Sequence, residues 1–503
     1  MVKEKAEKEN AEMGVDIDSL AVFCKRKGFV YPSGEIYGGL AGFWDYGPYG
    51  VEYVGNLKRE WWKFHVQKRE DMVGIDGSIV TNPKVWKASG HVDSFVDVAV
   101  LCKKCGYKGK VDKHEAHKAI CPKCKNKLEN KGEFNPMFLT QVGPVKEDSV
   151  TAYLRPETAQ LMFADFKAIQ ENARMKLPFG IAQIGKAFRN EISPREFLFR
   201  CREFEQMEIE YFIAPNMKCP KEYLDEIKGT KIKVLNEEMQ KKGKSEEKMD
   251  LLDALKKGIF KRDWHVYWIA NEYNWFVSLG ANPDKFRVRQ HMTEERSHYS
   301  SDTWDLEFEF PMGWRELQGF ADRSTYDLTQ HEKSSGKSME IVMEDGKKIL
   351  PEVVCEPSLG VGRAFIVFML SAYEEDKARE NIVLHLNPKL SPVKAAVFPI
   401  VKDEKMISIA KGIVKELKED WNVVYDESGS VGRRYARQDE IGTPYCITVD
   451  GDSLTGKTIT IRNRDTTQQI KVKITNLKEV LDGLLKGKIE FDKAGKKIDT
   501  RKK

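Results

Sequence analysis

The chain has 503 residues, of which 41% are hydrophobic and 32% charged, and its formal net charge is +5. This balance indicates a globular protein with room for about two to four domains. It lacks the apolar run of about 18 residues that a membrane-spanning helix needs. Nine cysteines, an odd number, argue against a secreted disulfide framework. Residues 1–16 lack an apolar signal core and are expected to be a solvated tail, so we expect a cytoplasmic protein.

Residues 17–91 are predicted to begin a domain that mixes helices and strands. A helix is expected over 19–27, and the glycine- and aromatic-rich run SGEIYGGLAGFWDYGP follows over 33–48. A second helix is expected over 51–69, and a strand with a turn over 72–83. The aromatic side chains of the second helix are typical of an ordinary core.

Four cysteines form two pairs with identical internal spacing. They are Cys102, Cys105, Cys121 and Cys124. A C-x-x-C pair places two thiolates on one tight turn, and two such turns complete a tetrahedral metal site. The sequence therefore predicts a knuckle that holds a structural Zn²⁺, within an insertion over 92–150; four unligated thiols are the alternative. Two substitute ligands lie between the pairs, His114 and His117.

Two strand-like runs with a turn-prone loop between them dominate residues 151–214. In the second run, polar or aromatic residues alternate with apolar ones. The first set is Phe204, Gln206, Glu208 and Glu210, and the second set is Met207, Ile209 and Tyr211. This alternation predicts an antiparallel strand with one face on a core and one facing a wet site. Charged residues flank the loop: Arg189, Glu191, Arg200 and Arg202. A surface ladder of salt bridges is the alternative.

Residues 215–310 are predicted to form a mixed α/β insertion. A stretch rich in lysine and glutamate over 218–257 is expected to be helical, and Trp264 and Trp268 are expected to pack against neighbouring helices. The segment 289–298 carries basic residues and follows an aromatic-rich stretch, a combination that can contact the end of a single-stranded RNA.

The part over 311–387 contains a second candidate ligand motif, EPSLGVGR, at 356–363. Small residues and glycines let the backbone approach a ligand closely, and an arginine and an apolar helix follow. This motif alone is weak support for a site.

From residue 388 to 503, strands alternate with helices, which predicts an α/β module with a mixed sheet. This part contains 24 Lys and Arg against 17 Asp and Glu, and three arginines, Arg433, Arg434 and Arg437, cluster on one expected helix. A basic module of this kind fits binding of a polyanion, although a solubility bias would give the same count.

Taken together, five motifs resemble the glycyl-tRNA synthetases of the homodimeric kind, which are class II aminoacyl-tRNA synthetases. They are the run at 33–48, RPETAQ at 155–160, FRNE at 188–191, FRCREFEQMEIEYF at 199–212 and EPSLGVGR at 356–363. The resemblance extends over about residues 17–475. It implies an α+β fold with an antiparallel sheet flanked by helices, in three catalytic parts, and an anticodon-binding domain over 388–503. The parts over 17–91, 151–214 and 311–387 would carry motifs 1, 2 and 3, with motif 1 at the interface of a homodimer.

The resemblance also implies a reaction. Glycine would be activated by ATP with Mg²⁺ and transferred to a tRNA, whose acceptor stem would approach 215–310, in particular 289–298. Because the attacking carboxylate is already an anion, the site needs charge neutralisation and positioning rather than a protein nucleophile. A site rich in arginine and glutamate fits that need.

Residue roles follow from the resemblance. Arg189, Glu191 and Arg363 would act on the reacting groups: Arg189 on the α-phosphate and the carboxylate, Glu191 on the adenine amino group, and Arg363 on the adenine or the terminal phosphate. Arg200 would hold the outer phosphates, Phe204 would stack on adenine, and Glu316 with Leu317 would lie beside ATP and Mg²⁺. The remaining residues of the expected ATP site are Asn190, Phe199, Cys201, Arg202, Glu203, Gly360, Val361 and Gly362.

Glycine has no side chain to recognise, so its pocket must bind the ammonium group and exclude larger amino acids by shape. By resemblance, the pocket comprises Glu157, Phe204, Glu205, Gln206, Met207, Glu208, Glu356, Pro357, Ser358, Leu359 and Gly360. Three positions depart from the pattern of the family: Leu161, Gln318 and Lys110. Leu161 could narrow the pocket.

Three other interpretations remain. A non-catalytic nucleic-acid-binding relative would be expected to have lost the ATP arginines, which are present here. A zinc-ribbon RNA-binding protein without catalysis would leave RPETAQ and EPSLGVGR unexplained. A class II synthetase of another specificity shares motifs 2 and 3, but RPETAQ and EPSLGVGR favour glycine.

Overall fold

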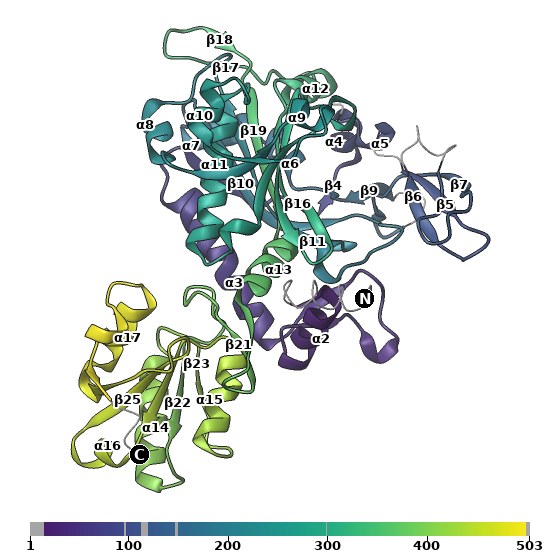
Figure 1. Cartoon of the computed structure of the whole chain (residues 1–503). Coiled ribbons are helices and arrows are strands. Elements are labelled where there is room, and N and C mark those ends of the chain that lie inside the picture. The colour runs from purple at the N-terminus through teal and green to yellow at the C-terminus, as the bar shows by residue number, and fades with distance from the viewer. Residues whose placement is uncertain (1–14, 95–96, 112–118, 146–148, 298, 499–503) are drawn as a thin grey trace.

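The computed structural model describes residues 15–94, 97–111, 119–145, 149–297 and 299–498. A large body built on one sheet carries two smaller sheets on one side, and a separate C-terminal domain lies beneath it (Figure 1). Most of the predicted N-terminal tail lies outside the described residues, as do His114, His117 and His298.

A nine-stranded sheet forms the centre of the large body. Its strands, in spatial order, are β13 (Glu247–Asp250), β12 (Lys231–Leu235), β14 (Phe286–Gln290), β15 (Asp302–Phe310), β16 (Gly313–Asp322), β19 (Glu352–Gly360), β11 (Glu203–Ile213), β10 (Phe179–Phe188) and β3 (Met72–Ile75). The five central pairs, from β14 to β10, are antiparallel, whereas β3 on β10 and β12 on β14 are parallel. An antiparallel sheet with helices on both faces is thus observed.

The two faces of the sheet differ in what covers them. On one face, Met207, Ile209 and Leu359 pack in the main hydrophobic core. Helices α2 (Ile17–Lys27), α3 (Pro48–Trp62), α11 (Asp263–Ser278) and α13 (Val361–Ala372) contribute to that core. On the other face, α6 (Ala159–Ala164), α7 (Phe166–Ala173) and α12 (Tyr326–Ser335) contribute to a smaller core around Phe179 and Phe212.

The N-terminal elements follow the sequence prediction closely. Asp16 caps α2, since its Oδ1 accepts a hydrogen bond from the Ser19 amide at 2.9 Å, and Gly28 ends the helix with φ of 80°. The expected helix over 51–69 is observed as α3, which continues as a π-helical turn over Lys63–Gln67. Trp61 is fully buried in the main core.

The predicted insertion over 215–310 contributes four strands to the same large sheet, β12, β13, β14 and β15. The stretch expected to be helical over 218–257 holds only short helices, α8 (Lys221–Glu226), α9 (Glu237–Lys241) and α10 (Leu251–Lys256), with β12 and β13 between them. That expectation was therefore wrong in part. Trp264 and Trp268 on α11 are fully buried, which confirms their packing role.

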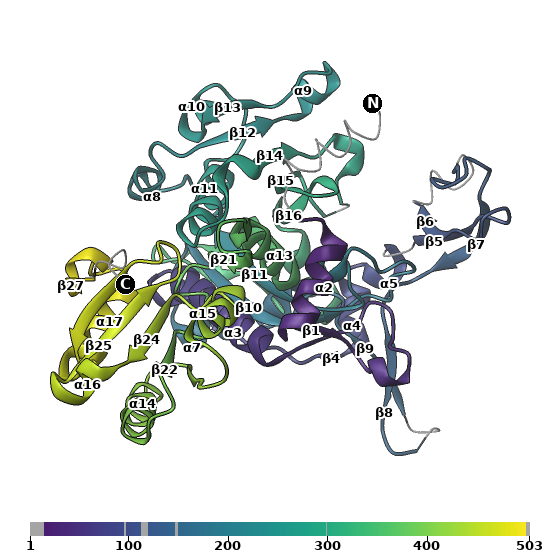
Figure 2. The same cartoon turned by 60° about the horizontal axis from the view of Figure 1, so that its bottom comes forward.

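Two three-stranded sheets extend from the side of the large body (Figure 2). One contains β6 (Lys108–Val111), β5 (Asp97–Leu101) and β7 (Glu129–Phe134), and carries the four clustered cysteines at its end. The other contains β4 (Val80–Thr81), β9 (Val150–Leu154) and β8 (Leu139–Val142). The strands β5, β6, β7 and β8, which lie within the predicted insertion over 92–150, thus belong to these two small sheets rather than to the large one.

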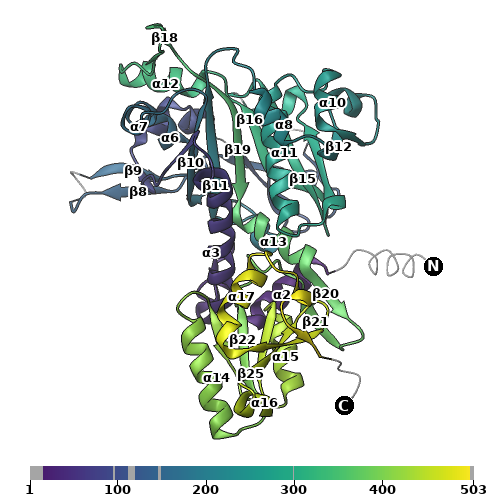
Figure 3. The same cartoon turned by 90° about the vertical axis from the view of Figure 1, so that its left-hand side faces the viewer.

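The C-terminal domain holds a six-stranded mixed sheet and has a hydrophobic core of its own. Its helices and strands lie together below the large body (Figure 3). In spatial order its strands are β23 (Val423–Tyr425), β22 (Ala395–Pro399), β24 (Tyr445–Val449), β25 (Thr458–Asn463), β26 (Gln469–Lys473) and β27 (Lys496–Lys497). Its principal helices are α14 (Glu404–Leu417), α15 (Val431–Glu440) and α17 (Leu477–Leu485). The predicted mixed sheet is confirmed, because β22 pairs in parallel with β23 and β24 while the later strands are antiparallel. Strands β26 and β27 and the short helix α16 (Gly451–Thr455) were not among the elements expected from the sequence.

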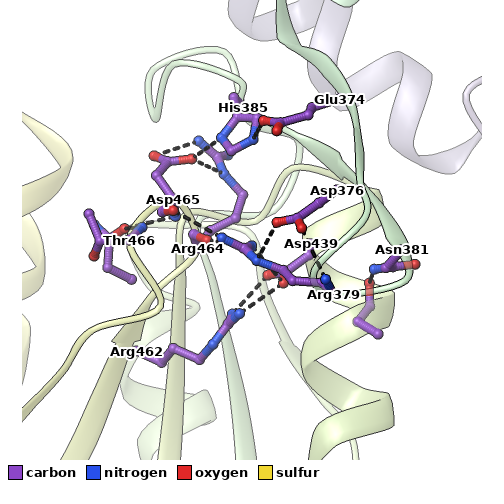
Figure 4. A network of polar contacts seen from close by, with 12 residues as sticks. Glu374, Asp376, Arg379, Asn381, His385, Asp439, Arg462, Arg464, Asp465 and Thr466 are labelled. Atoms are coloured by element: carbon purple, nitrogen blue, oxygen red, sulfur yellow. Dashed lines mark hydrogen bonds and ion pairs between the residues drawn. The ribbon is translucent and has the colours of Figure 1, made fainter.

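A network of polar contacts joins the two parts (Figure 4). Arg379 lies in the turn between β20 (Tyr373–Asp376) and β21 (Asn381–Leu384), and its Nη1 donates to the Arg464 carbonyl at 2.8 Å and lies 3.3 Å from Asp439 Oδ2. Asp439 on α15 also accepts two hydrogen bonds from Arg462, at 2.8 and 2.9 Å. Charge-assisted contacts therefore fix this hairpin against the C-terminal domain.

Candidate active site

The first group of predicted site residues gathers around the loop between β10 and β11. Arg200 Nη2 lies 2.9 Å from Glu191 Oε2, and Arg202 Nε donates to the Glu191 carbonyl at 2.9 Å. The Arg189 guanidinium lies over the Phe204 ring, 5.4 Å from its centroid, and Arg189 Nε donates to the Pro156 carbonyl at 2.8 Å. The two arginine-bearing strand ends and RPETAQ are thus brought together.

Motif EPSLGVGR reaches the same place from β19 and α13. Arg363 Nη1 lies 3.0 Å from Glu316 Oε1 on β16, and the Arg363 guanidinium lies 4.6 Å from the Phe199 ring centroid. Gly362 permits this approach, because a Cβ atom at that position would lie 2.6 Å from the Leu198 carbonyl oxygen. Arg363 also holds the pKa of Glu316 below its usual range.

The run at 33–48 packs against the loop between β10 and β11. Arg202 donates through its amide to the Gly42 carbonyl and through Nη1 to the Ala41 carbonyl, both at 2.9 Å. Gly42 has φ of 82°, and a Cβ there would lie 2.7 Å from Pro194. This contact explains the glycine at position 42, although the loop is far away in sequence.

The second group of predicted residues lines the sheet face beside RPETAQ. Glu208 pairs with Ser358 across β11 and β19 and accepts a hydrogen bond from the Ser358 hydroxyl at 2.6 Å and another from Thr158. Glu157 Oε2 lies 3.1 Å from His91 Nε2. Both oxygens of Glu356 accept from Arg323 Nη1 at 3.0 Å.

Burial governs the electrostatics of these carboxylates. Burial, followed by the charge of Glu157, raises the pKa of Glu208. Burial also raises the pKa of Glu356 to about 8, against the opposing effect of Arg323. For Glu157 burial is outweighed by His91, Arg323 and Arg189, so its pKa lies well below the usual range. A cation placed among these acids would be strongly stabilised.

The predicted wet face of β11 is in fact buried at its far end. Glu208 and Glu210 are 1% and 0% exposed, and the oxygens of Glu208, Glu210 and Glu356 that approach one another lie within 4.8 Å. The alternating pattern gave the correct faces, but α6 and α12 cover the polar face as well. A surface ladder of salt bridges does not describe this strand.

The four clustered cysteines converge in space. Their Sγ atoms all lie within 4.8 Å of one another, with Cys102 to Cys124 and Cys105 to Cys121 both at 3.4 Å. A tetrahedral Zn²⁺ with bonds of about 2.3 Å requires sulfur separations of about 3.8 Å. The donor set and its spacing therefore fit a closed structural zinc site.

Comparisons with known proteins agree with this geometry. The family described as "tRNA synthetase class II core domain (G, H, P, S and T)" matches residues 145–371, and "Anticodon binding domain" matches residues 394–484. The glycine–tRNA ligase of Thermobifida fusca (strain YX) is 40% identical over 498 residues, which cover 94% of this chain and 98% of the relative.

Two further glycine–tRNA ligases give similar values. That of Treponema denticola is 39% identical over 475 residues, 92% of this chain and 96% of its own. That of Borreliella burgdorferi (strain B31) is 41% identical over 471 residues, 92% and 95% of the two chains. The chain belongs to the glycine–tRNA ligase family. The predictions of a class II synthetase fold and of an aminoacyl-tRNA ligase are confirmed.

Within this family fold, several predicted site residues point away from the shared face. Glu205 pairs with Lys58 at 2.8 Å and Glu203 with Lys186. Five others have side chains in the hydrophobic core: Cys201, Met207, Leu317, Leu359 and Val361. These residues can contribute to a ligand site only through their backbone.

The departures from the family pattern fall in different places. Gln318 pairs with Leu359, whereas its neighbour Gly319 pairs with Ser358. Since paired residues share a face, Gln318 lies on the face opposite Ser358 and Glu208. Leu161 on α6 is half-buried and lies against Gly77. Lys110 lies on β6.

Several polar residues that contact the predicted acids were not predicted from the sequence. They are His91, Thr158, Gln160 and Arg323, and Asp327 in turn contacts Gln160 and Arg323. Thr158 and Gln160 belong to RPETAQ, so the motif itself was the available signal. Asp327 lies in the first turn of α12, and Arg323 lies between β16 and that helix, four residues before Asp327.

No helix in the described segments combines the length and apolar character needed to cross a bilayer.

The arginines predicted to cluster on α15 lie in two different environments. Arg434 is buried and donates to the Gly429 carbonyl at 2.8 Å, whereas Arg437 pairs with Asp426 and remains 43% exposed.

Proposed function

We propose that the chain attaches glycine to its cognate tRNA in the cytoplasm, through a glycyl-adenylate formed from glycine and ATP. The observation that carries this proposal is the meeting of Arg189, Arg200 and Arg363 beside an acidic pocket on one sheet face. Arginines held on rigid strands can neutralise phosphate charge in two-pronged contacts. The membership of the glycine–tRNA ligase family supports glycine as the amino acid.

On the nucleotide side, Arg189 would contact the α-phosphate and the glycine carboxylate, and Arg200 the outer phosphates. Arg200 and Arg363 now pair with Glu191 and Glu316, at 2.9 and 3.0 Å. These guanidinium groups would exchange a carboxylate for phosphate oxygens when ATP enters. Glu191 would then be released to read the adenine amino group.

Further contacts to ATP are proposed from the same geometry. The Phe204 ring would stack on adenine, and Phe199 would support Arg363. The Glu316 carboxylate would hold Mg²⁺, which would neutralise phosphate charge when bound. Leu317, Gly360 and Val361 would contribute backbone, because Leu317 and Val361 are buried in the core.

On the glycine side, Glu157, Glu208 and Glu356 would surround the ammonium group, with Ser358 and Gln206 beside them. The Ser358 hydroxyl and Gln206 Nε2 contact Glu208 Oε1 at 2.6 and 3.3 Å, so this carboxylate is already oriented. A pocket this crowded would exclude larger amino acids by shape.

Replacing Glu157 with alanine tests the pocket. The variant is expected to abolish glycine-dependent ATP–pyrophosphate exchange, because the ammonium group would lose a buried, ionised partner. Exchange measured with all twenty amino acids, for the parent and the variant, checks both activity and specificity. Near-normal exchange by Glu157→Ala would remove this residue from the pocket.

The knuckle is proposed to hold structural Zn²⁺ on Cys102, Cys105, Cys121 and Cys124. We expect about one zinc per chain in metal analysis, and loss of that zinc in Cys121→Ser together with a lower Tm. The matched control is Cys219→Ser, a buried cysteine outside the cluster, which should retain the metal. Full zinc content in Cys121→Ser would contradict the assignment.

The chain is also proposed to form a homodimer and to contact tRNA through two of its own regions. Large apolar side chains are exposed at Ile36, Tyr37 and Leu40, with 88%, 90% and 62% of their surface accessible. Exposed apolar clusters of this kind are typical of an interface. The C-terminal domain would contact the anticodon, and the segment 289–297 would lie near the acceptor end.

A further inference from the structure

Gln160, in the RPETAQ motif, lies between two carboxylates that the motif alone does not connect. Its Nε2 is 3.2 Å from Glu157 Oε1 and 3.0 Å from Asp327 Oδ1. Its Oε1 is 3.0 Å from His331 Nε2. The side chain is fully buried. One amide therefore donates both N–H groups to carboxylates and accepts from an imidazole.

Only one orientation of this amide satisfies all three contacts. The opposite orientation would set the amide oxygen against the two carboxylates, with no hydrogen between them. Burial lowers the pKa of His331, which favours a neutral ring. A neutral ring with its proton on Nε2 donates to Gln160 Oε1, and this contact selects the observed orientation.

The second carboxylate, Asp327, continues the chain of contacts to the other side of the pocket. Asp327 accepts from Arg323 Nε and Nη2, at 2.7 and 2.8 Å. Arg323 Nη1 then donates to both oxygens of Glu356 at 3.0 Å. The Arg323 guanidinium is 1% exposed and lies 3.8 Å from the Tyr299 ring centroid, so it has little freedom to move.

A continuous series of charge-assisted hydrogen bonds thus runs from Glu157 through Gln160, Asp327 and Arg323 to Glu356. Its two ends are the acids proposed to flank the glycine ammonium group. Glu157 precedes α6 and Glu356 lies on β19, so local backbone structure does not set their separation. The neutral amide of Gln160 donates to both Glu157 and Asp327 and so holds these two like-charged carboxylates in place.

We propose that Gln160 is a positioning residue for glycine, which fixes Glu157 relative to the Arg323–Glu356 pair so that both acids face the ammonium group. The inference rests on the proposed roles of Glu157 and Glu356. Gln160 itself would not touch glycine or ATP. Its loss should therefore weaken glycine binding and leave ATP binding nearly unchanged.

Two substitutions of similar volume separate this role from simple packing. Gln160→Met removes both donors, and Gln160→Glu replaces them with a third carboxylate facing Glu157 and Asp327. In pyrophosphate exchange with the full chain, Gln160→Met should raise the KM for glycine about 10- to 100-fold. Gln160→Glu should raise it further, while the KM for ATP stays within about threefold in both.

The matched control is Gln170→Glu. Gln170 lies on the next helix, α7, where its Nε2 donates to the Met175 carbonyl at 2.8 Å, and it is half-buried. The KM of Gln170→Glu for glycine should equal that of the parent. Thermal unfolding of each variant identifies any that fail to fold. If either Gln160 variant does not fold, His331→Leu, which removes the donor to Gln160 Oε1, should still raise the KM for glycine by about threefold or more.

The inference is overturned if folded Gln160→Met keeps the parental KM for glycine, or if the KM values for glycine and ATP rise together. The proposed function fails in a different way: the parent would show no glycine-dependent exchange, or Glu157→Ala would retain it. An active parent, an inactive Glu157→Ala and an unchanged Gln160→Met would reject the positioning role alone.

Discussion

Replacing Arg189 with alanine is expected to lower kcat/KM for glycine-dependent pyrophosphate exchange by about 10³-fold, because the variant loses a preorganised charge at the reacting phosphate. Arg189 follows the last residue of β10, and its Nε is anchored on the Pro156 carbonyl at 2.8 Å. This anchor directs the guanidinium toward Phe204 before any ligand binds. A lysine at this position could supply the charge but not the anchored fork, so Arg189→Lys should recover only part of the activity.

Arg315→Ala is the control for a general effect of removing an arginine. Arg315 is exposed on β16, and its Nη1 donates to the neighbouring Trp314 carbonyl at 2.9 Å. Steady-state exchange kinetics should leave this variant at the parental rate. If Arg189→Ala and Arg315→Ala had the same kcat/KM for pyrophosphate exchange, the nucleotide would have to bind elsewhere.

The sequence was sufficient to predict those parts of the site that lie on regular elements. The alternation in 204–211 gave the correct faces of β11, and the C-x-x-C pairs gave the correct cluster. In both cases the pattern depends on residues that are close in the chain. The geometry of a strand or a tight turn then places the side chains.

The missed residues depend on contacts between distant segments. Gln160 and Asp327 are 167 residues apart, and no local pattern connects them. The same limit explains β12, where KIKVL lies within a stretch rich in lysine and glutamate. This segment forms a strand because β14 and β13 pair with its two edges, and such pairing overrides a weak local helical preference.

The burial of Glu208 and Glu210 could not be predicted from alternation alone. Polar residues on one face of a strand usually indicate exposure to solvent. Here α6 and α12 cover that face, and Glu208 is held by hydrogen bonds from Thr158 and Ser358. A strand with charged residues on one face and covered on both faces is therefore better read as the wall of a site.

The junction between the catalytic body and the C-terminal domain carries the second large prediction. Asp439 is 3% exposed and bonds Arg462 at 2.8 and 2.9 Å, with Arg379 at 3.3 Å (Figure 4). Asp439→Ala would leave two guanidinium groups without their buried carboxylate. The expected loss of unfolding free energy is about 3–5 kcal/mol, measured by denaturant unfolding of the C-terminal domain.

Asp426→Ala is the matched control, since Asp426 pairs with the exposed Arg437 and should cost about 1 kcal/mol or less. An equal loss in both variants would show that burial of the Asp439 pair adds nothing to stability.

Asp439→Ala should affect the two half-reactions, glycine activation and tRNA charging, to different extents. Glycine activation takes place in the catalytic body and should continue at nearly the parental rate at temperatures where the C-terminal domain of the variant is still folded. Charging of tRNA requires the C-terminal domain to be held at a fixed position, because two linked contacts bind more tightly than either alone. Its kcat/KM for tRNA should therefore fall by about 10- to 100-fold. If charging were unaffected while the domain was loosened, the hairpin at Arg379 would only connect the two parts, and the anticodon would be bound without a rigid junction.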